Sequence, residues 1–161
     1  MTMPADFFAA VAALGAVETL DVDALRLLYK VECSGEDFYN HLADRIGDER
    51  AADLLRRNGR EERGHAERVR KVLGIKLGHA YEPSDEERSR YPIALPDAIS
   101  AEFLPLIVQG ELDGDTGYQR WADREGDPEA QRLLRLNGRE ETTHGERVRE
   151  VIVLLKAGVK G

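Results

Sequence analysis

The chain has 161 residues, of which 31 are acidic and 23 basic, and its formal net charge of -8 argues against binding to nucleic acid or to an anionic membrane surface. Charged residues make up 34% of the chain and aromatic residues only 6%, a composition typical of long amphipathic helices. The single cysteine, Cys33, excludes an intramolecular disulfide and a four-thiolate metal site within one chain. We therefore expect an all-α protein of the reducing cytoplasm.

The first predicted element is an apolar segment at 7–14. It is too short to span a bilayer, and no Lys or Arg precedes it as in a signal peptide. We interpret it as a short N-terminal helix that packs on the rest of the protein or on a partner chain.

The rest of the chain repeats one pattern at an offset of 79 residues, as Glu32 and Glu111 show (111 − 32 = 79). The longest shared runs are Ala-Asp-Arg from 43 and 122, Asn-Gly-Arg-Glu-Glu from 58 and 137, and Glu-Arg-Val-Arg from 67 and 146. The copies align without a gap. We expect a single domain over 1–161 whose two halves, about 21–77 and 100–155, share one local structure.

The first half is predicted to form two helices, over about 21–46 and 48–77. Gly47 suits the left-handed conformation that ends many helices. Asp48 can accept hydrogen bonds from the free amides at the start of the next helix. The half is therefore an αα-hairpin.

The second half predicts the same hairpin, with helices over about 100–125 and 128–155. Pro105 should restrict the early turns of the first of these helices, because proline is tolerated only near a helix start. Gly126 and Asp127 take the places of the glycine and the capping aspartate in the turn.

A connector of about 78–99 joins the hairpins, and the capping-box spacing of Ser84 and Glu87 predicts one short helix within it. A helix of about 28 residues is about 40 Å long, so a connector of this length can return along the bundle. Two hairpins joined by one long crossover predict a ferritin-like four-helix bundle.

Each hairpin carries a Glu-x-x-His pair on its second helix and a glutamate 30 residues earlier on its first (62 − 32 = 30). Residues three apart share one face of a helix, and a turn midway brings the earlier glutamate level with the pair. One glutamate from each of two helices and Glu-x-x-His from each of the other two is the di-iron or di-manganese pattern of helical bundles. The candidate metal ligands are Glu32, Glu62, His65, Glu111, Glu141 and His144.

The residue types explain which metal fits. Four buried carboxylates repel one another, but two divalent cations neutralise them. Carboxylates with two imidazoles and no thiolate suit two iron ions, with manganese possible, and both metals change oxidation state. Two metals about 3.5–4 Å apart can bind dioxygen or peroxide between them. This composition predicts an oxidoreductase centre.

Two tyrosines are candidate catalytic residues. Tyr39 and Tyr118 follow Glu32 and Glu111 by seven residues, nearly two full helical turns (39 − 32 = 7). Each shares the inward face with its glutamate and can either hydrogen-bond a ligand carboxylate across the bundle or serve only in core packing.

Other polar residues near the ligands are open to two interpretations. Asn58 and Asn137 precede the paired glutamates by one turn. One interpretation is that they support the ligands by hydrogen bonds, and the other is that they lie on the helix surface. Glu36 and Asp115 lie one turn beyond the upstream glutamates, on a route for iron or on an exposed face.

Three further residues that often bind metals are expected to lie outside the site. His41 faces the far side of its helix, and His79 belongs to the connector. Cys33 points away from the ligands and is expected to be a small buried residue.

The run Glu-Cys-Ser-Gly-Glu-Asp-Phe-Tyr from 32 and the later Glu-Arg-Gly-His from 62 resemble the rubrerythrin-like branch of the ferritin-like superfamily. The resemblance covers both hairpins and carries over the six ligands one by one. It implies a di-iron protein that reduces hydrogen peroxide or reacts with dioxygen, commonly as a homodimer, in oxidative-stress or iron metabolism.

Two departures from rubrerythrin are visible. Full-length rubrerythrin adds a rubredoxin domain with four cysteines, and the one cysteine of this chain implies a separate electron-donor protein. Rubrerythrin also has a further glutamate three residues after the third-helix ligand, where this chain has Gly114. The ligand set is therefore closer to the symmetrical one of bacterioferritin.

Alternative functions stay open. A ferroxidase or iron-storage protein would use the same site, but few residues follow Leu155 to form the fifth helix of cage-forming ferritins, so a cage is not expected. A di-iron monooxygenase with 7–14 as a membrane contact is disfavoured by the mean hydropathy of -0.48 and the acidic charge. A purely structural helical protein is the last alternative.

Overall fold

The computed structural model describes residues 3–159, and within that range every regular element is a helix. The helices are α1 (Phe7–Gly15), α2 (Val22–Arg45), α3 (Glu49–Leu77), α4 (Asp85–Arg88), α5 (Leu104–Asp123) and α6 (Pro128–Val159). The predictions of an all-α protein and of a short N-terminal helix are confirmed.

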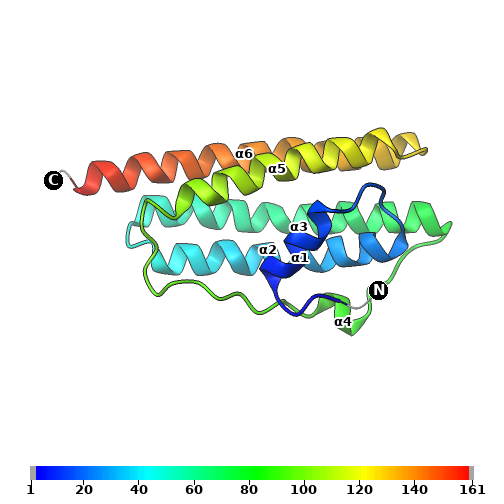
Figure 1. Ribbon diagram of the computed structural model, residues 1–161, viewed down its shortest axis with the longest axis horizontal. Helices are drawn as coiled ribbons and strands as arrows, with labels where there is room; N and C mark the ends of the chain where they lie inside the picture. The colour runs from blue at the N-terminus through cyan, green and yellow to red at the C-terminus, as the bar shows by residue number, and fades with distance from the viewer. Residues whose placement is uncertain (1–2, 160–161) are drawn as a thin grey trace.

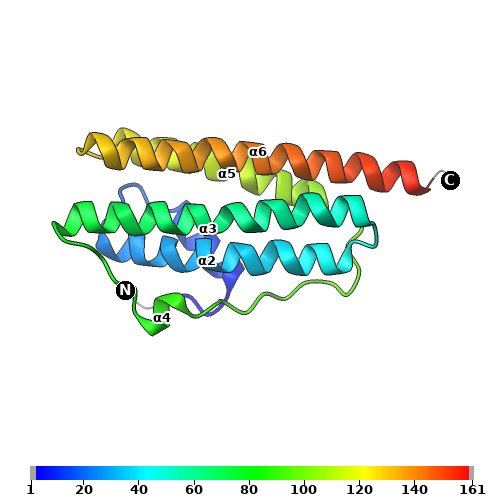
Figure 2. The same cartoon turned by 180° about the vertical axis from the view of Figure 1, so that it is seen from behind.

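The four long helices form two antiparallel hairpins, α2 with α3 and α5 with α6 (Figure 1). Helices α3 and α6 pack against each other and join the two hairpins, as the reverse view shows (Figure 2). The result is the ferritin-like four-helix bundle that the repeat predicts. The helices that carry the Glu-x-x-His pairs are thus the ones in direct contact.

The connector between α3 and α5 runs back along the outside of α2 (Figure 1). The backbone N–H of Tyr91 anchors it there by donating to Oγ of Ser34 at 3.0 Å. Helix α4 lies within the connector, and its first turn has the predicted capping box between Ser84 and Glu87. Both features confirm the crossover topology.

Helix ends follow the predicted caps in the first hairpin. Asp48 accepts a hydrogen bond from the N–H of Ala51 at 2.8 Å. Gly47 has a φ of 74°, in the left-handed region, and joins α2 to α3. The predicted bounds of both helices agree with the structure to within about one residue.

The bounds predicted for α5 were wrong at both ends. The helix starts at Leu104 and not near Ser100, which places Pro105 in its first turn, where the missing N–H costs no helical hydrogen bond. It ends at Asp123, where the N–H of Arg124 bonds back to the carbonyl of Trp121 at 3.2 Å. A right-handed turn therefore closes α5, in place of a left-handed glycine at position 126.

Helix α1 packs on the bundle, as one of its two interpretations predicts. The ring of Phe7 stacks on Phe38 of α2, with centroids 5.3 Å apart. Burying such a side chain contributes about 1.5–3 kcal/mol. The segment after α1 is held by Trp121, whose Nε1 donates to the carbonyl of Val17 at 2.8 Å. The N-terminal segment therefore ties α2 to the end of α5.

Among the helices of residues 3–159, none combines the length and apolar character needed to cross a membrane.

Candidate metal centre

Four buried side chains from α3 and α6 meet in the middle of the bundle. Glu62, His65, Glu141 and His144 each offer one ligand atom, and these atoms lie within 4.8 Å of one another. Both imidazoles are completely buried, and the two glutamates nearly so. Glu32 of α2 joins them, with its Oε2 3.5 Å from Nδ1 of His65. The contact between α3 and α6 thus unites the two Glu-x-x-His pairs.

The imidazoles present the same nitrogen to the cluster. Nδ1 of His65 lies 3.2 Å from Glu62 and 3.5 Å from Glu141. Nδ1 of His144 lies 3.4 Å from each of the same two carboxylates. The rings stack with centroids 5.1 Å apart and an interplanar angle of 16°. This arrangement aims two imidazoles and two carboxyl groups at a common centre.

Several of these buried atoms have no hydrogen-bond partner. They are Nδ1 of His65, Nδ1 of His144, and one carboxylate oxygen each of Glu62 and Glu141. Leaving a buried polar atom unpaired costs about 1–3 kcal/mol, so native proteins rarely do so without a reason. Cations bound among these atoms would satisfy all four. The donor set therefore fits a metal site.

Two tyrosines each form a hydrogen bond with the upstream glutamate of the other hairpin. The hydroxyl of Tyr39 on α2 donates to Glu111 on α5, and that of Tyr118 on α5 donates to Glu32 on α2. Burial, then the nearby carboxylates, raise the pKa of both phenols well above the ordinary value. Both tyrosines are thus neutral donors that also pack in the core. Their catalytic role stays a prediction.

A second layer of side chains holds His65 from the opposite hairpin. Its Nε2 lies 2.9 Å from Glu140, and Glu140 pairs with Arg68 at 2.7 Å. Arg68 also donates to Oδ1 of Asn137 at 3.0 Å, while Nδ2 of Asn137 donates to the carbonyl of His65 at 3.2 Å. The ring and the backbone of this histidine are both fixed.

The corresponding layer around His144 is similar but not identical. Arg147 donates to Glu61 at 2.6 Å and to Oδ1 of Asn58 at 2.9 Å, and Nδ2 of Asn58 donates to the carbonyl of His144 at 3.1 Å. Nε2 of His144, however, is 3.9 Å from Glu61 and has no hydrogen-bond partner. Oε2 of Glu61 also lies 3.7 Å from Nε of Arg57.

Sequence reasoning missed four residues of this layer: Glu61, Arg68, Glu140 and Arg147. The signal was present, because all four lie in the longest runs shared by the two halves at the same offset. The interpretation of Asn58 and Asn137 as surface residues was wrong, since both are completely buried.

Protons occupy the cluster in the metal-free protein. Burial, followed by repulsion from Glu62 and Glu141, raises the pKa of Glu32 well above its ordinary value. Burial alone would lower the pKa of the imidazoles, but the carboxylates dominate and raise that of His144 to about 9. The same balance raises the pKa of His65 well above its ordinary value. Positive charge is therefore held where a cation would bind.

The pKa of Glu111 is also raised, by burial and by the charges of Glu141 and Glu62. Burial opposes the ionisation of Glu141 as well, but a hydrogen bond from Glu111 and the imidazoles lower its pKa well below the ordinary value. Glu140 is ionised too, since His65 and Arg68 outweigh its burial and lower its pKa to about 2.

Other candidates lie outside the cluster. Glu36 is buried and paired with Arg63, so the interpretation of an exposed face was wrong for it. Asp115 accepts a hydrogen bond from Thr142 at 2.6 Å. Among the remaining candidates, His79 is exposed in the connector.

His41 and Cys33 are half-buried, so the expectation that Cys33 is a small buried residue was wrong. Neither contributes to the group of metal-binding side chains.

In a comparison with protein families, the family model described as Rubrerythrin matches residues 23–152. The match spans both hairpins and all six candidate ligands. Neither the curated proteins nor the solved structures contain a match to the chain.

Proposed function

Because the chain belongs to the rubrerythrin family, we propose that it is a di-iron carboxylate oxidoreductase that reduces hydrogen peroxide or dioxygen with electrons from a separate donor protein. One observation carries the proposal: the unpartnered Nδ1 atoms of His65 and His144 face the unpartnered oxygens of Glu62 and Glu141 at one buried point. We place the protein in the cytoplasm, as a homodimer.

The charge of the candidate ligands supports a site for two divalent ions. Six side chains would hold them: Glu32, Glu62, His65, Glu111, Glu141 and His144. Their four carboxylates carry four negative charges, which two divalent cations neutralise. Oxygen and imidazole donors without thiolate favour iron or manganese, and such ions supply reversible electron transfer to a bound oxidant.

The chain's own residues would orient and isolate the reaction. Tyr39 and Tyr118 hold the upstream glutamates through hydroxyl hydrogen bonds, and their raised pKa values keep those hydroxyls protonated. Glu140 and Arg68 fix the ring of His65. Reduction of one peroxide consumes two electrons and two protons and releases two water molecules. These 161 residues contain one cysteine and cannot form a rubredoxin-type centre by themselves, so the proposal requires an electron donor outside them.

The test is metal analysis of anaerobically purified protein, followed by stopped-flow mixing of the reduced protein with peroxide or oxygen. We expect about two iron ions per chain and rapid loss of the reduced spectrum. The double variant Glu62→Ala/Glu141→Ala should bind little metal while keeping its helices. If peroxide and oxygen both leave the reduced spectrum unchanged for many minutes, the enzyme proposal fails.

Iron oxidation for storage is the second candidate. It is favoured by Gly114, which stands where rubrerythrin has an additional glutamate and leaves the ligand set symmetrical between the hairpins. Size-exclusion chromatography separates the two: a shell-sized particle supports storage, and a dimer counts against it.

A further inference from the structure

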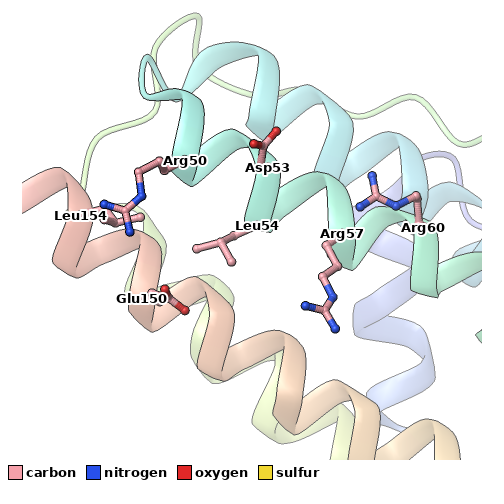
Figure 3. A pocket seen from close by; sticks show the side chains of 7 residues that line it. All are labelled: Arg50, Asp53, Leu54, Arg57, Arg60, Glu150 and Leu154. Carbon is pink, nitrogen blue, oxygen red and sulfur yellow. The ribbon is translucent and has the colours of Figure 1, made fainter.

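A groove opens between α3 and α6 on the surface of the bundle, with a cavity volume of about 490 Å³ (Figure 3). Three arginines, two acids and two leucines line it: Arg50, Asp53, Leu54, Arg57, Arg60, Glu150 and Leu154. Leu54 and Leu154 are half-buried between the two helices, while the charged residues are exposed around them. An apolar centre with a charged rim is the usual composition of a protein docking site.

The charge of the groove is opposite to that of the whole chain. The chain has a net charge of -8, yet the groove has three arginines against two carboxylates. Within residues 3–159, Arg50 and Arg60 form neither an ion pair nor a side-chain hydrogen bond. Their charges are therefore free to act on an approaching molecule, and they favour one with an acidic surface.

Two of the three groove arginines do not belong to the repeat on which the fold rests. At the offset of 79 residues, Arg57 corresponds to Leu136 and Arg50 corresponds to Glu129. The second hairpin folds into the same structure without either arginine. Arg50 and Arg57 are therefore not needed to build an αα-hairpin, whereas Arg60 corresponds to Arg139 of the second hairpin.

The groove is connected to the metal cluster by one side chain. Nε of Arg57 lies 3.7 Å from Oε2 of Glu61, and Oε1 of Glu61 lies 3.9 Å from Nε2 of the candidate ligand His144. In the other half, the residue at the place of Arg57 is the apolar Leu136, and it offers no such ionic link. A molecule that contacts Arg57 in the groove is thus linked to an imidazole of the site through two side chains, Arg57 and Glu61.

We propose that this groove is the docking surface for an acidic one-electron carrier protein, which delivers electrons to the metal site on the side of His144. The proposal rests on the proposed function, which requires an external donor. The carrier loses one electron at each encounter, and two encounters supply the two electrons that convert one peroxide and two protons into two water molecules. A small, mostly polar contact suits such transient redox encounters better than a stable dimer.

The test uses the metal-loaded protein and an acidic [2Fe–2S] ferredoxin as the probe. The double variant Arg50→Glu/Arg60→Glu reverses two charges in the groove and leaves Arg57 and the ligands intact. The control Lys71→Glu/Arg120→Glu makes the same change in net charge at exposed positions outside the groove. All four are surface positions, and Arg50 lies in the first turn of α3, where a glutamate is well tolerated.

At low ionic strength we expect the groove variant to oxidise the reduced ferredoxin about ten-fold more slowly than the parent protein, and the control to differ by less than about two-fold. The difference should vanish in about 0.5 M salt. The affinity for oxidised ferredoxin, measured by calorimetry, should also fall in the groove variant and change little in the control. Equal losses in both variants would show that only net charge matters and would overturn the proposal, as would a parent dimer that the groove variant dissociates.

Reduction by dithionite separates this proposal from the proposed function. If the dithionite-reduced protein reacts with peroxide but ferredoxin binds every variant alike, the docking surface is wrong and the enzyme proposal stands. If ferredoxin binding depends on the groove but the dithionite-reduced protein does not react with peroxide, the docking surface stands and the enzyme proposal fails.

Discussion

The backbone of Gly35 lies so close to Glu62 that a Cβ atom at position 35 would stand 3.0 Å from Cδ of the carboxylate. The equivalent Gly114 is less crowded, since its Cβ would be 3.6 Å from Cγ of Glu141. Gly35→Ala should therefore displace Glu62 and weaken metal binding by about ten-fold, while Gly114→Ala should change it by less than about three-fold. Anaerobic titration with ferrous ion measures both.

Alanine stabilises a helix interior by about 0.5–1 kcal/mol relative to glycine, so thermal unfolding of the two metal-free variants checks that neither has lost its fold. Equal metal affinities in the two variants would show that the carboxylate of Glu62 moves without consequence.

Removing a crossed tyrosine hydroxyl should destabilise the metal-free protein. Tyr118→Phe leaves an oxygen of Glu32 without its donor and removes the acceptor that Nδ2 of Asn137 contacts at 3.4 Å. An unpaired buried group costs about 1–3 kcal/mol, which lowers the melting temperature of a chain of this size by roughly 2–10 °C. Tyr39→Phe should lower it by a similar or smaller amount, because it removes one hydrogen bond.

The control for these variants is Tyr91→Phe, whose hydroxyl contacts only Sδ of Met3, at 3.9 Å and outside the cluster. Calorimetry of metal-free samples should show a change within about 1 °C for it. A Tyr91→Phe shift as large as that of Tyr118→Phe would contradict the assignment of the hydroxyl to the support of Glu32.

The two second-layer glutamates should differ in their effect on metal binding. Glu140→Gln replaces a carboxylate 2.9 Å from Nε2 of His65 and should weaken metal affinity by about 10–100-fold. Glu61→Gln should weaken metal affinity by less than about ten-fold, because Glu61 is 3.9 Å from Nε2 of His144 and forms no hydrogen bond with it. Titration with cobalt(II), followed by visible absorbance, measures the affinities. Equal losses of metal affinity in the two variants would mean that Glu61 forms a hydrogen bond with His144 once metal is bound.

The stability of the metal-free protein should fall as pH rises. The pKa of His144 is raised to about 9 in the folded protein, above the value of 6.5 expected when unfolded. The contribution of His144 to the free energy of unfolding is present below about pH 6.5 and is lost as pH rises through 9. Between these two pH values only the folded state holds the proton. The loss in the free energy of unfolding is up to about 3 kcal/mol.

Urea unfolding between pH 6.5 and 9.5 measures this dependence, with the metal-loaded protein as the control. Bound cations take the place of the protons on the imidazoles, so the loaded protein should not lose stability in that range. Parallel curves for the two forms would contradict the assignment.

Much of this architecture could be predicted because the offset of 79 residues and the spacing of 30 residues fix both the hairpins and the level of each candidate ligand. The second layer could not be predicted in the same way. Glu61 and Glu140 precede the paired glutamates by one residue, which turns them about 100° around the helix, onto what looks like a solvent face. Only the packing of α3 on α6 brings each of them toward the histidine of the other hairpin.

The start of α5 shows a different limit. The proline at position 105 restricted the possible starts, but the choice of Leu104 over Ser100 depends on how the end of the connector is held against α2. The backbone N–H of Ile99 bonds there to the carbonyl of Arg45 at 3.2 Å. That contact is tertiary, and the local sequence has no signal for it.

The hydrogen bonds around the site run from each hairpin to the histidine or glutamate of the other, so neither hairpin alone can assemble half of the centre. Metal loading therefore stabilises the closure of one hairpin on the other. Without ions, the cluster between the halves is held only by protons and hydrogen bonds, and cellular proteases would meet that form open more often than the metal-loaded one. The lifetime of the protein in the cell would then follow the supply of metal.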